Sequence, residues 1–305
     1  MLDPAAFPEE LPDQVFGAAV QFGEVGPPPP GSTQLSEQVW VTEEVVWAEV
    51  EGYRVLVHGT EVAVLDVGDD ADPSMVGPMI YSWATRAVAL HAGRFSLHAS
   101  LVRVGDEHVM IGGHSGAGKS TTVAALAHRH GATVLIDDVV HLDMVDGRPV
   151  ARPFPRPIHL MDDAVERLGL EVSGTRIGTG PYSKTAVAVE VPDEPVPVDQ
   201  LVTLLAFDPD PSEDWPNTIL PTVEPTTDEP VVARTVTGAE RLRWVVRLAN
   251  NGGLASFGSR AVPFFEWSTQ VAGTLPTLEI ARLRGADTLD RVCETIIETA
   301  TRPPD

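Results

Sequence analysis

The sequence predicts an α/β fold, and three observations along the chain lead to that class. A glycine-rich loop, residues 113–120 (the glycine loop), lies between an apolar strand pattern and a helical pattern. A second apolar, β-branched run at 133–136 ends in two adjacent acids. Strand-like and helical patterns then alternate toward the C-terminus, as in α/β proteins. We expect one α/β domain over residues 76–305 and an irregular arm with a β-rich portion over residues 1–75.

The first part of the chain predicts β structure before any helix. Residues 1–37 contain four consecutive prolines and little apolar periodicity, which indicates an irregular arm. Short β-branched runs separated by turns over 39–67 predict an antiparallel meander. Apolar residues at helical spacing predict a helix over 76–92.

The second part of the chain predicts the alternating elements of the α/β domain. Strands at 95–104 and 108–112 flank a tight turn and lead into the glycine loop, and a helix over 119–130 follows it, ending at Gly131. The later elements are a helix at 162–168, strands at 185–191 and 200–207, an exposed loop at 208–230, helices at 238–250 and 262–272, a strand at 278–283 and a helix at 289–299.

Composition and charge exclude several classes of partner. The 305 residues include 44 acids against 21 Lys and Arg, a formal charge of −23, which repels nucleic acids and anionic membranes. No apolar run approaches 18 residues, and the N-terminus lacks the basic start and apolar core of a signal peptide. The single cysteine, Cys293, allows no intramolecular disulfide. We therefore expect a cytoplasmic protein without nucleic-acid or membrane partners.

The glycine loop satisfies the pattern G-x-x-x-x-G-K-[ST] in full. Its residues are, in order, Gly113, His114, Ser115, Gly116, Ala117, Gly118, Lys119 and Ser120. Small residues let successive backbone N–H groups converge on one anion, and the following helix aims its free N–H groups at the same point. We expect Lys119 to neutralise the β- and γ-phosphates of a nucleotide and the Ser120 hydroxyl to bind Mg²⁺. The alternative, a chance glycine turn, lacks this context of strand before and helix after.

Asp137 and Asp138 end the strand pattern that follows the glycine-loop helix. Only this one helix separates them from Lys119, so we expect the acids on a strand that neighbours the strand before the glycine loop. One carboxylate can orient a metal ion while the other accepts a proton from an attacking hydroxyl. The alternative is a solvated turn or a helix cap.

The motifs from residue 97 to residue 138 occur together in one known family. They are Leu97-His98-Ala99-Ser100, the turn Gly105-Asp106-Glu107, the glycine loop, Gly131 and Asp137-Asp138. Together they resemble bacterial HPr kinase/phosphorylase, and the proline-spaced residues 152–157 resemble a feature of related proteins. The resemblance covers about residues 95–160. It implies a P-loop fold of the HPr kinase and phosphoenolpyruvate carboxykinase type.

The resemblance also implies roles for individual residues. His98 would lie near the phosphates and tune the acidic pair, although a lone histidine on an apolar strand is normally a core residue. Asp137 and Asp138 would be catalytic, one as general base and one on Mg²⁺, and we place Asp138 with Ser120 as metal ligands. The family often forms hexamers, which leaves a homo-oligomer open.

Two departures from the family pattern limit what is carried over. His114 stands where the family usually has an acid, and the later Pro-Gly-Arg-Asn signature is absent. Residues 181–184 occupy a comparable place, where Lys184 would supply a positive charge to the phosphate or simply be solvated. Because the missing signature serves the phosphorylase reaction and HPr docking, we assign neither to this chain.

The sequence therefore leads to two functional hypotheses. The first is an ATP- and Mg²⁺-dependent kinase that phosphorylates a hydroxyl of a peptide, a protein or a small alcohol, with GTP or pyrophosphate left open as donors. The second is a non-catalytic nucleotide-binding partner in a peptide-modification or regulatory complex. Arg152 and Arg156 would hold phosphate or an acidic substrate, or form ordinary ion pairs. We expect Trp244, Trp267 and Cys293 to be core residues.

Overall fold

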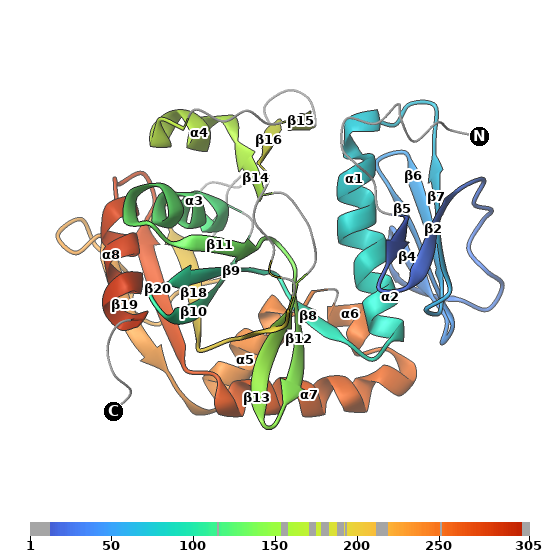
Figure 1. Cartoon of the computed structure of the whole chain (residues 1–305). Helices are drawn as coiled ribbons and strands as arrows, with labels where there is room; N and C mark the ends of the chain where they lie inside the picture. Colours follow the sequence, from blue (N-terminus) through green and yellow to red (C-terminus); the bar gives the residue numbers. More distant parts are fainter. Residues whose placement is uncertain are drawn as a thin grey trace. The chain divides into compact units, whose positions relative to one another are not determined.

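The computed structural model describes most of the chain and divides it into two compact units (Figure 1). The described residues are 13–114, 116–153, 158–170, 175–177, 183–187, 192, 194–211, 219–250 and 252–300. The first unit is built from Met1–Ser96, Ser173–Ala186 and Asn250–Glu266, and the second from Leu97–Val172, Val187–Ala249 and Trp267–Asp305. The first unit thus extends past residue 75, the limit expected from the sequence. Both helices and several sheets are present, which confirms the α/β class.

The first unit contains a seven-stranded sheet in the order β1-β2-β7-β6-β5-β4-β3. Its strands are β1 (Gln14–Val15), β2 (Ala18–Phe22), β3 (Thr33–Ser36), β4 (Val39–Val41), β5 (Val45–Val50), β6 (Tyr53–His58) and β7 (Val62–Val67). The meander over 39–67 is confirmed as β4 to β7. The expectation of an irregular arm was wrong for the segments that form β1, β2 and β3. All four residues of β3 are exposed, so no apolar alternation marks that strand, and backbone pairing with β4 defines it.

Helical segments complete the first unit. The predicted helix over 76–92 is confirmed as part of a continuous helical run. At the start of this run, the Asp72 carboxylate accepts a hydrogen bond from the Ser74 backbone N–H at 3.0 Å. The run consists of η2 (Pro73–Met75), α1 (Val76–Met79), the π-helical η3 (Ile80–Ala84) and α2 (Thr85–His91). The unit also holds the hairpin of β15 (Thr175–Ile177) and β16 (Lys184–Val187), together with α6 (Gly252–Ala255) and η5 (Gly258–Arg260).

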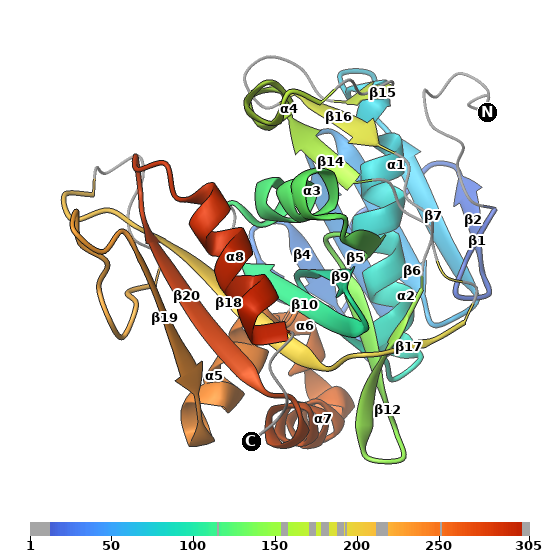
Figure 2. The same ribbon diagram turned by 60° about the vertical axis from the view of Figure 1, so that its left-hand side comes forward.

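The second unit is organised around a six-stranded sheet in the order β11-β9-β10-β18-β20-β19 (Figure 2). Its strands are β9 (Ala99–Val104), β10 (Glu107–Gly113), β11 (Thr133–Ile136), β18 (Gln200–Phe207), β19 (Val231–Val236) and β20 (Thr277–Leu283). β10, β18 and β20 run parallel, whereas β9 is antiparallel to both β10 and β11. The carboxyl ends of β10, β11, β18 and β20 therefore meet the amino end of β9 at one edge of the sheet.

Helices α3 (Lys119–His130) and α8 (Leu289–Ala300) pack on this sheet and share its core. The α3 helix ends at Gly131 in the left-handed conformation, as predicted. Cys293 on α8 is fully buried, with its Sγ atom 3.9 Å from the Thr122 carbonyl oxygen. Trp244 and Trp267 are also core residues, which confirms the predictions for all three side chains.

The rest of the second unit surrounds this core. A smaller sheet has the order β17-β13-β12-β8, and further helices cover the unit. These elements are β8 (Phe95–Leu97), β12 (Val140–Val145), β13 (Arg148–Arg152), β14 (Ile158–Met161), α4 (Asp162–Leu168), β17 (Val196–Pro197), α5 (Gly238–Leu248) and α7 (Ala261–Thr274), of which β8 and α7 begin in segments of the first unit. The sequence did not predict β12, β13, β17 or β19. Residues 154–157, with Arg156, and 188–191 lie outside the described residues.

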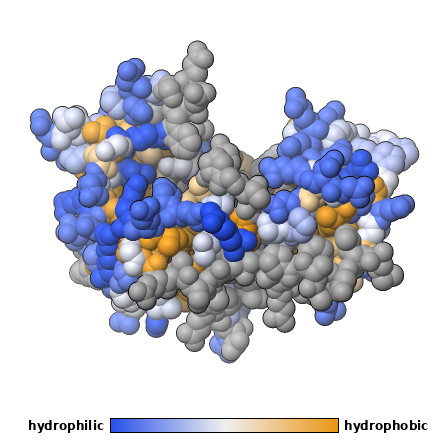
Figure 3. Space-filling model, turned by 90° about the horizontal axis from the view of Figure 1, so that it is seen from above, coloured by the Kyte–Doolittle hydropathy of each residue, from blue (hydrophilic) through white to orange (hydrophobic). Residues whose placement is uncertain are grey.

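The described surface is mostly polar on the face drawn in Figure 3, with small apolar patches between hydrophilic residues. This agrees with the large excess of acids in the sequence. Within the described part of the chain, every helix is too short or too polar to cross a membrane.

Candidate active site

The backbone of the glycine loop adopts a conformation that requires glycine at specific positions. Gly116 and Gly118 have φ values of 80° and 93°, in the left-handed region that side chains disfavour. A Cβ atom on Gly113 would lie 3.0 Å from the Leu204 carbonyl oxygen, so β18 approaches the loop too closely for a side chain. Gly118 is also the N-cap of α3, and the helix begins at Lys119. Ser115 lies outside the described residues.

Three predicted residues come together beside the glycine loop. The Lys119 Nζ atom lies 3.1 Å from His98 Nε2 and 3.6 Å from Asp138 Oδ1, and only 7% of Lys119 is exposed. The other ring nitrogen of His98, Nδ1, lies 3.2 Å from the same Asp138 oxygen. The lysine, the histidine and the acid belong to three separate segments, and they form one compact cluster of opposite charges.

His98 reaches this cluster because it interrupts the strand pattern. The sequence predicted one strand over 95–104, but the structure has two, β8 and β9, with His98 between them. The His98 backbone N–H donates to the Leu248 carbonyl at the end of α5, at 2.7 Å, which fixes the break. A residue within an unbroken strand would alternate strictly between the two faces of the sheet.

Asp138 holds an unusual backbone conformation. Its φ of 67° is left-handed, a region that non-glycine residues adopt rarely and at some energetic cost. The turn closes with a 2.8 Å hydrogen bond from the Val139 N–H to the Asp137 carbonyl. Strained residues of this kind cluster at functional sites, and here the turn directs the Asp138 carboxylate to His98 and Lys119.

The two adjacent acids have different surroundings. Asp137 is 3% exposed, and its Oδ1 accepts a hydrogen bond from the Ser100 hydroxyl on β9. The Asp138 side chain is 25% exposed. The sequence placed both acids on a strand next to β10, and this was wrong, because β9 lies between β10 and β11. Ser100 stands on that intervening strand and was assigned no role from the sequence.

His114 stands in the glycine loop with an unsatisfied ring nitrogen. Its Nε2 is buried and has no hydrogen-bond partner among the described residues. Burial lowers the pKa of His114, and the positive charge of Arg247 lowers it further. Both effects favour the neutral form of the imidazole over the cationic form.

The residues at this edge suit Mg²⁺ held jointly with phosphate. No group of three or more His, Cys, Asp or Glu side chains that could hold a metal occurs in the described residues. Mg²⁺ usually binds through one or two carboxylates and the oxygens of its phosphate ligand, so it does not need such a group. Ser120 follows Lys119 in the first turn of α3, and the partly exposed Asp138 offers the carboxylate.

Arg282, near the end of β20, supports the glycine loop from the other side. Its Nε donates to the Ala117 carbonyl at 3.1 Å, and its guanidinium would lie 2.9 Å from a Cβ atom on Gly118. Burial lowers the Arg282 pKa, as do the nearby charges of Arg284 and Arg167. The sequence analysis assigned Arg282 no role. The only sequence feature that marks it is a charged residue within an apolar strand pattern.

Arg152 and Lys184 were other cations considered as phosphate contacts from the sequence. Arg152 forms an ion pair with Asp143 on the neighbouring strand β12, which is the ordinary alternative considered for it. Lys184 begins β16 in the first unit.

The sequence matches no protein-family model and no curated protein. Among solved structures, the chain is similar to the Hpr(Ser) kinase/phosphatase from Coxiella burnetii, with 15% sequence identity and a TM-score of 0.30. The match covers 67% of this chain and 94% of that chain. A likeness of this degree assigns no function to the residues described above.

Proposed function

We propose that this chain is a P-loop kinase of the HPr kinase-like, serine-kinase type, which uses ATP and Mg²⁺ to phosphorylate a hydroxyl group. The observation that carries the proposal is the cluster of Lys119, His98 and Asp138 beside the glycine loop. The loop motif supplies the phosphate site, and the cluster supplies a cation and an acid at the position of the terminal phosphate. GTP and pyrophosphate remain alternative donors, and the acceptor is a peptide, a protein or a small alcohol.

The residues divide the work of phosphoryl transfer. Backbone N–H groups of the glycine loop and Lys119 hold the β- and γ-phosphates. Ser120 and Asp138 would hold Mg²⁺, which supplies neutralisation of phosphate charge when bound. The acceptor oxygen forms a bond to the γ-phosphorus while the bond to the bridging oxygen breaks and ADP leaves. The hydroxyl proton passes to a carboxylate of the acidic pair.

The surroundings of the two acids favour different roles. The partly exposed Asp138 is the acid within reach of a ligand, as metal partner or as proton acceptor. The buried Asp137 is bonded by Ser100 and holds the turn that presents Asp138. In this division Asp137 is a positioning residue. His98 contacts both Lys119 and Asp138 and can adjust the charge of each.

The experiment that tests the proposal follows the γ-phosphate. The purified chain is incubated with γ-labelled ATP, MgCl₂ and an extract of its source cells, and labelled products are separated. We expect label on a peptide, protein or metabolite, with loss of transfer in Lys119→Ala and normal transfer in Arg148→Ala. Arg148 is an exposed cation on the β12–β13 hairpin and is the matched control.

The second candidate function, a nucleotide-binding partner without transfer chemistry, predicts a different outcome. Tight binding of nucleotide with neither label transfer nor hydrolysis would support it and refute the kinase. The observation in its favour is the Lys119–Asp138 ion pair, in which the two charged groups engage each other.

A further inference from the structure

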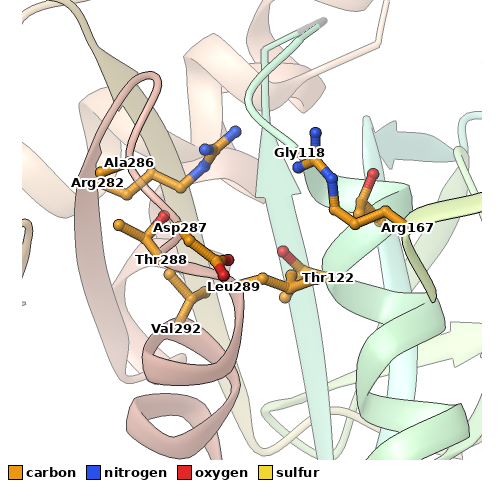
Figure 4. A pocket seen from close by; sticks show the side chains of 10 residues that line it. Gly118, Thr122, Arg167, Arg282, Ala286, Asp287, Thr288, Leu289 and Val292 are labelled. Carbon is orange, nitrogen blue, oxygen red and sulfur yellow. The ribbon is translucent and has the colours of Figure 1, made fainter. Parts of the chain in front are cut away.

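A pocket opens beside the glycine loop on the flank away from the acidic pair (Figure 4). It is a small depression, and its roughly 360 Å³ of empty space includes the open solvent at its mouth. Its lining includes Gly118 and Thr122 from the start of α3, Arg167 from α4, Arg282 from β20, and Asp287 and Val292 around the start of α8. All of these residues belong to the second unit.

The order of the strands places this pocket and the reacting cluster on opposite flanks of the glycine loop. β10 leads into the loop, with β9 and β11 on one side and β18 and β20 on the other. His98 and Asp138 adjoin β9 and β11, whereas Arg282 and Asp287 lie on and after β20. A donor whose terminal phosphate faces His98 and Asp138 therefore extends its remaining groups toward the pocket.

The end of the pocket near the glycine loop is positively charged. Figure 4 shows the guanidinium groups of Arg167 and Arg282 at the end where Gly118 lies. Neither guanidinium forms an ion pair with any of the described acids, although the chain carries 44 of them. Arg282 is also partly buried, and a cation withdrawn from water is stabilised by a counter-charge. A phosphate leaving the loop along the first turn of α3 would provide it.

The other end of the pocket combines one acceptor group with an apolar wall. Among the described residues, the Asp287 carboxylate has no hydrogen-bond or ion-pair partner, and it lines the pocket beside Thr288. Leu289 and Val292 on α8 and Ala286 supply apolar contacts. A few polar groups on an apolar lining are typical of small-molecule sites. A sugar or base with O–H or N–H donors fits this combination, whereas a bare polyphosphate does not.

We propose that this pocket holds the nucleoside of the phosphate donor, with Asp287 accepting hydrogen bonds from its sugar or base. This inference rests on the proposed function and deepens it, because it makes the donor a nucleoside triphosphate rather than pyrophosphate. Arg167 and Arg282 contact the phosphate nearest the nucleoside. The bond that breaks in transfer remains on the opposite flank, beside Lys119.

The test compares ATP with inorganic tripolyphosphate, which carries the same phosphate chain without a nucleoside. Binding of each to the full chain is measured by titration calorimetry with MgCl₂. The variants are Asp287→Asn, which removes the charged acceptor, and Ala286→Trp, which fills the pocket from a loop. Asp106→Asn is the matched control, since Asp106 is exposed in the β9–β10 turn at the opposite edge of the sheet. Thermal unfolding verifies that each variant folds.

We expect the unsubstituted chain to bind ATP at least tenfold more tightly than tripolyphosphate. Asp287→Asn should weaken ATP binding about tenfold, the effect of one lost charged hydrogen bond, and Ala286→Trp should weaken it about tenfold or more because the indole occupies the pocket. Neither variant should change tripolyphosphate binding. Equal affinity for the two ligands, or equal loss of both in the pocket variants, overturns the nucleoside pocket but keeps the phosphate site. Absence of binding of either ligand overturns the proposed function itself.

Discussion

The Nζ atom of Lys119 lies 3.6 Å from Oδ1 of Asp138, so the lysine of the glycine loop is paired with the acid that follows β11. Lys119 is 7% exposed, and a cation at that depth needs a nearby negative charge. In the proposed reaction the phosphates of the donor replace Asp138 as the partner of Lys119. Ligand binding thereby frees the Asp138 carboxylate for its own role.

Replacing Asp138 should separate nucleotide binding from phosphoryl transfer. In Asp138→Asn, Lys119 loses its anionic partner. When binding is measured without Mg²⁺, the variant should therefore bind ATP at least as tightly as the unsubstituted chain does. Label transfer from γ-labelled ATP should fall by about 100-fold or more, the usual contribution of a general base. Calorimetry and a quenched transfer assay measure the two effects.

The same variant distinguishes the two roles left open for Asp138. If Asp138 mainly holds the metal, raising MgCl₂ should restore much of the transfer rate. If it accepts the proton, added Mg²⁺ has no effect. Asp106→Asn, at the far edge of the sheet, serves as the charge-matched control and should transfer label normally. Unchanged transfer in Asp138→Asn would contradict the proposed mechanism.

A pair of glycine variants should reveal the tight packing of the glycine loop. Gly118 and Gly131 cap the two ends of α3, and both have a left-handed φ, of 93° and 71°. A Cβ atom on Gly118 would meet Arg282 at 2.9 Å, whereas one on Gly131 would meet nothing within 4 Å. Both Ala variants should lose about 1 kcal/mol of unfolding free energy from backbone strain.

Only Gly118→Ala should also weaken binding of tripolyphosphate, by about tenfold or more, because Arg282 and the loop must shift. Urea unfolding and calorimetry provide the two measurements. Equal ligand affinity in the two variants would show that the close approach of Arg282 does not shape the phosphate site.

Ser100→Ala should expose the positioning role of Asp137. The buried carboxylate would lose the hydroxyl that donates to it, at a cost of about 1–3 kcal/mol in unfolding free energy. Transfer should fall through a lower kcat with little change in KM for ATP, because the turn that presents Asp138 is loosened. Ser36→Ala, on the exposed strand β3, is the control. Loss of stability with unchanged kcat would make Ser100 purely structural.

His91, at the end of α2, should make the stability of the first unit depend on pH. Burial, with the charges of Arg260 and His58, lowers its pKa from 6.5 to about 4. Between these values the unfolded chain binds a proton that the folded chain does not, so stability is complete above pH 6.5 and declines as pH falls toward 4.

The corresponding variant is His91→Gln, whose amide oxygen can still accept the hydrogen bond that Arg260 donates to Nδ1 at 3.2 Å. From pH 7 to pH 5 the unsubstituted chain should lose more unfolding free energy in urea than the variant does. The carboxylates affect both proteins alike, so the difference isolates His91. Parallel losses in the two proteins would contradict the assignment.

Much of the second unit was predictable because its signals are local. The glycine loop has a fixed spacing of residue types, and the strand and helix beside it follow clear patterns, which the structure confirms as β10 and α3. The strand before Asp137 is likewise confirmed as β11. Strands such as β3 and β19 were missed because their side chains are mostly exposed or half-buried, and neighbouring backbones define them.

The contacts within the candidate site were less predictable because they join distant segments. Ser100 and Asp137 are 37 residues apart, and Arg282 and Ala117 are 165 apart. Neither pair has a spacing that suggests contact before the strand order is known. The position of β9 between β10 and β11 depends on the same non-local pairing, so the sequence named Asp137 and Asp138 but misplaced their strand.

The hydrogen bond from Arg282 to Ala117 also sets an order of events during protein synthesis. Ala117 emerges from the ribosome long before Arg282, and β20 must be translated before it can pair with β18. A nascent chain that has made only the glycine loop and α3 therefore lacks one wall of the site. If the proposed function holds, nucleotide stabilises this unit only after β20 has been translated and has paired with β18.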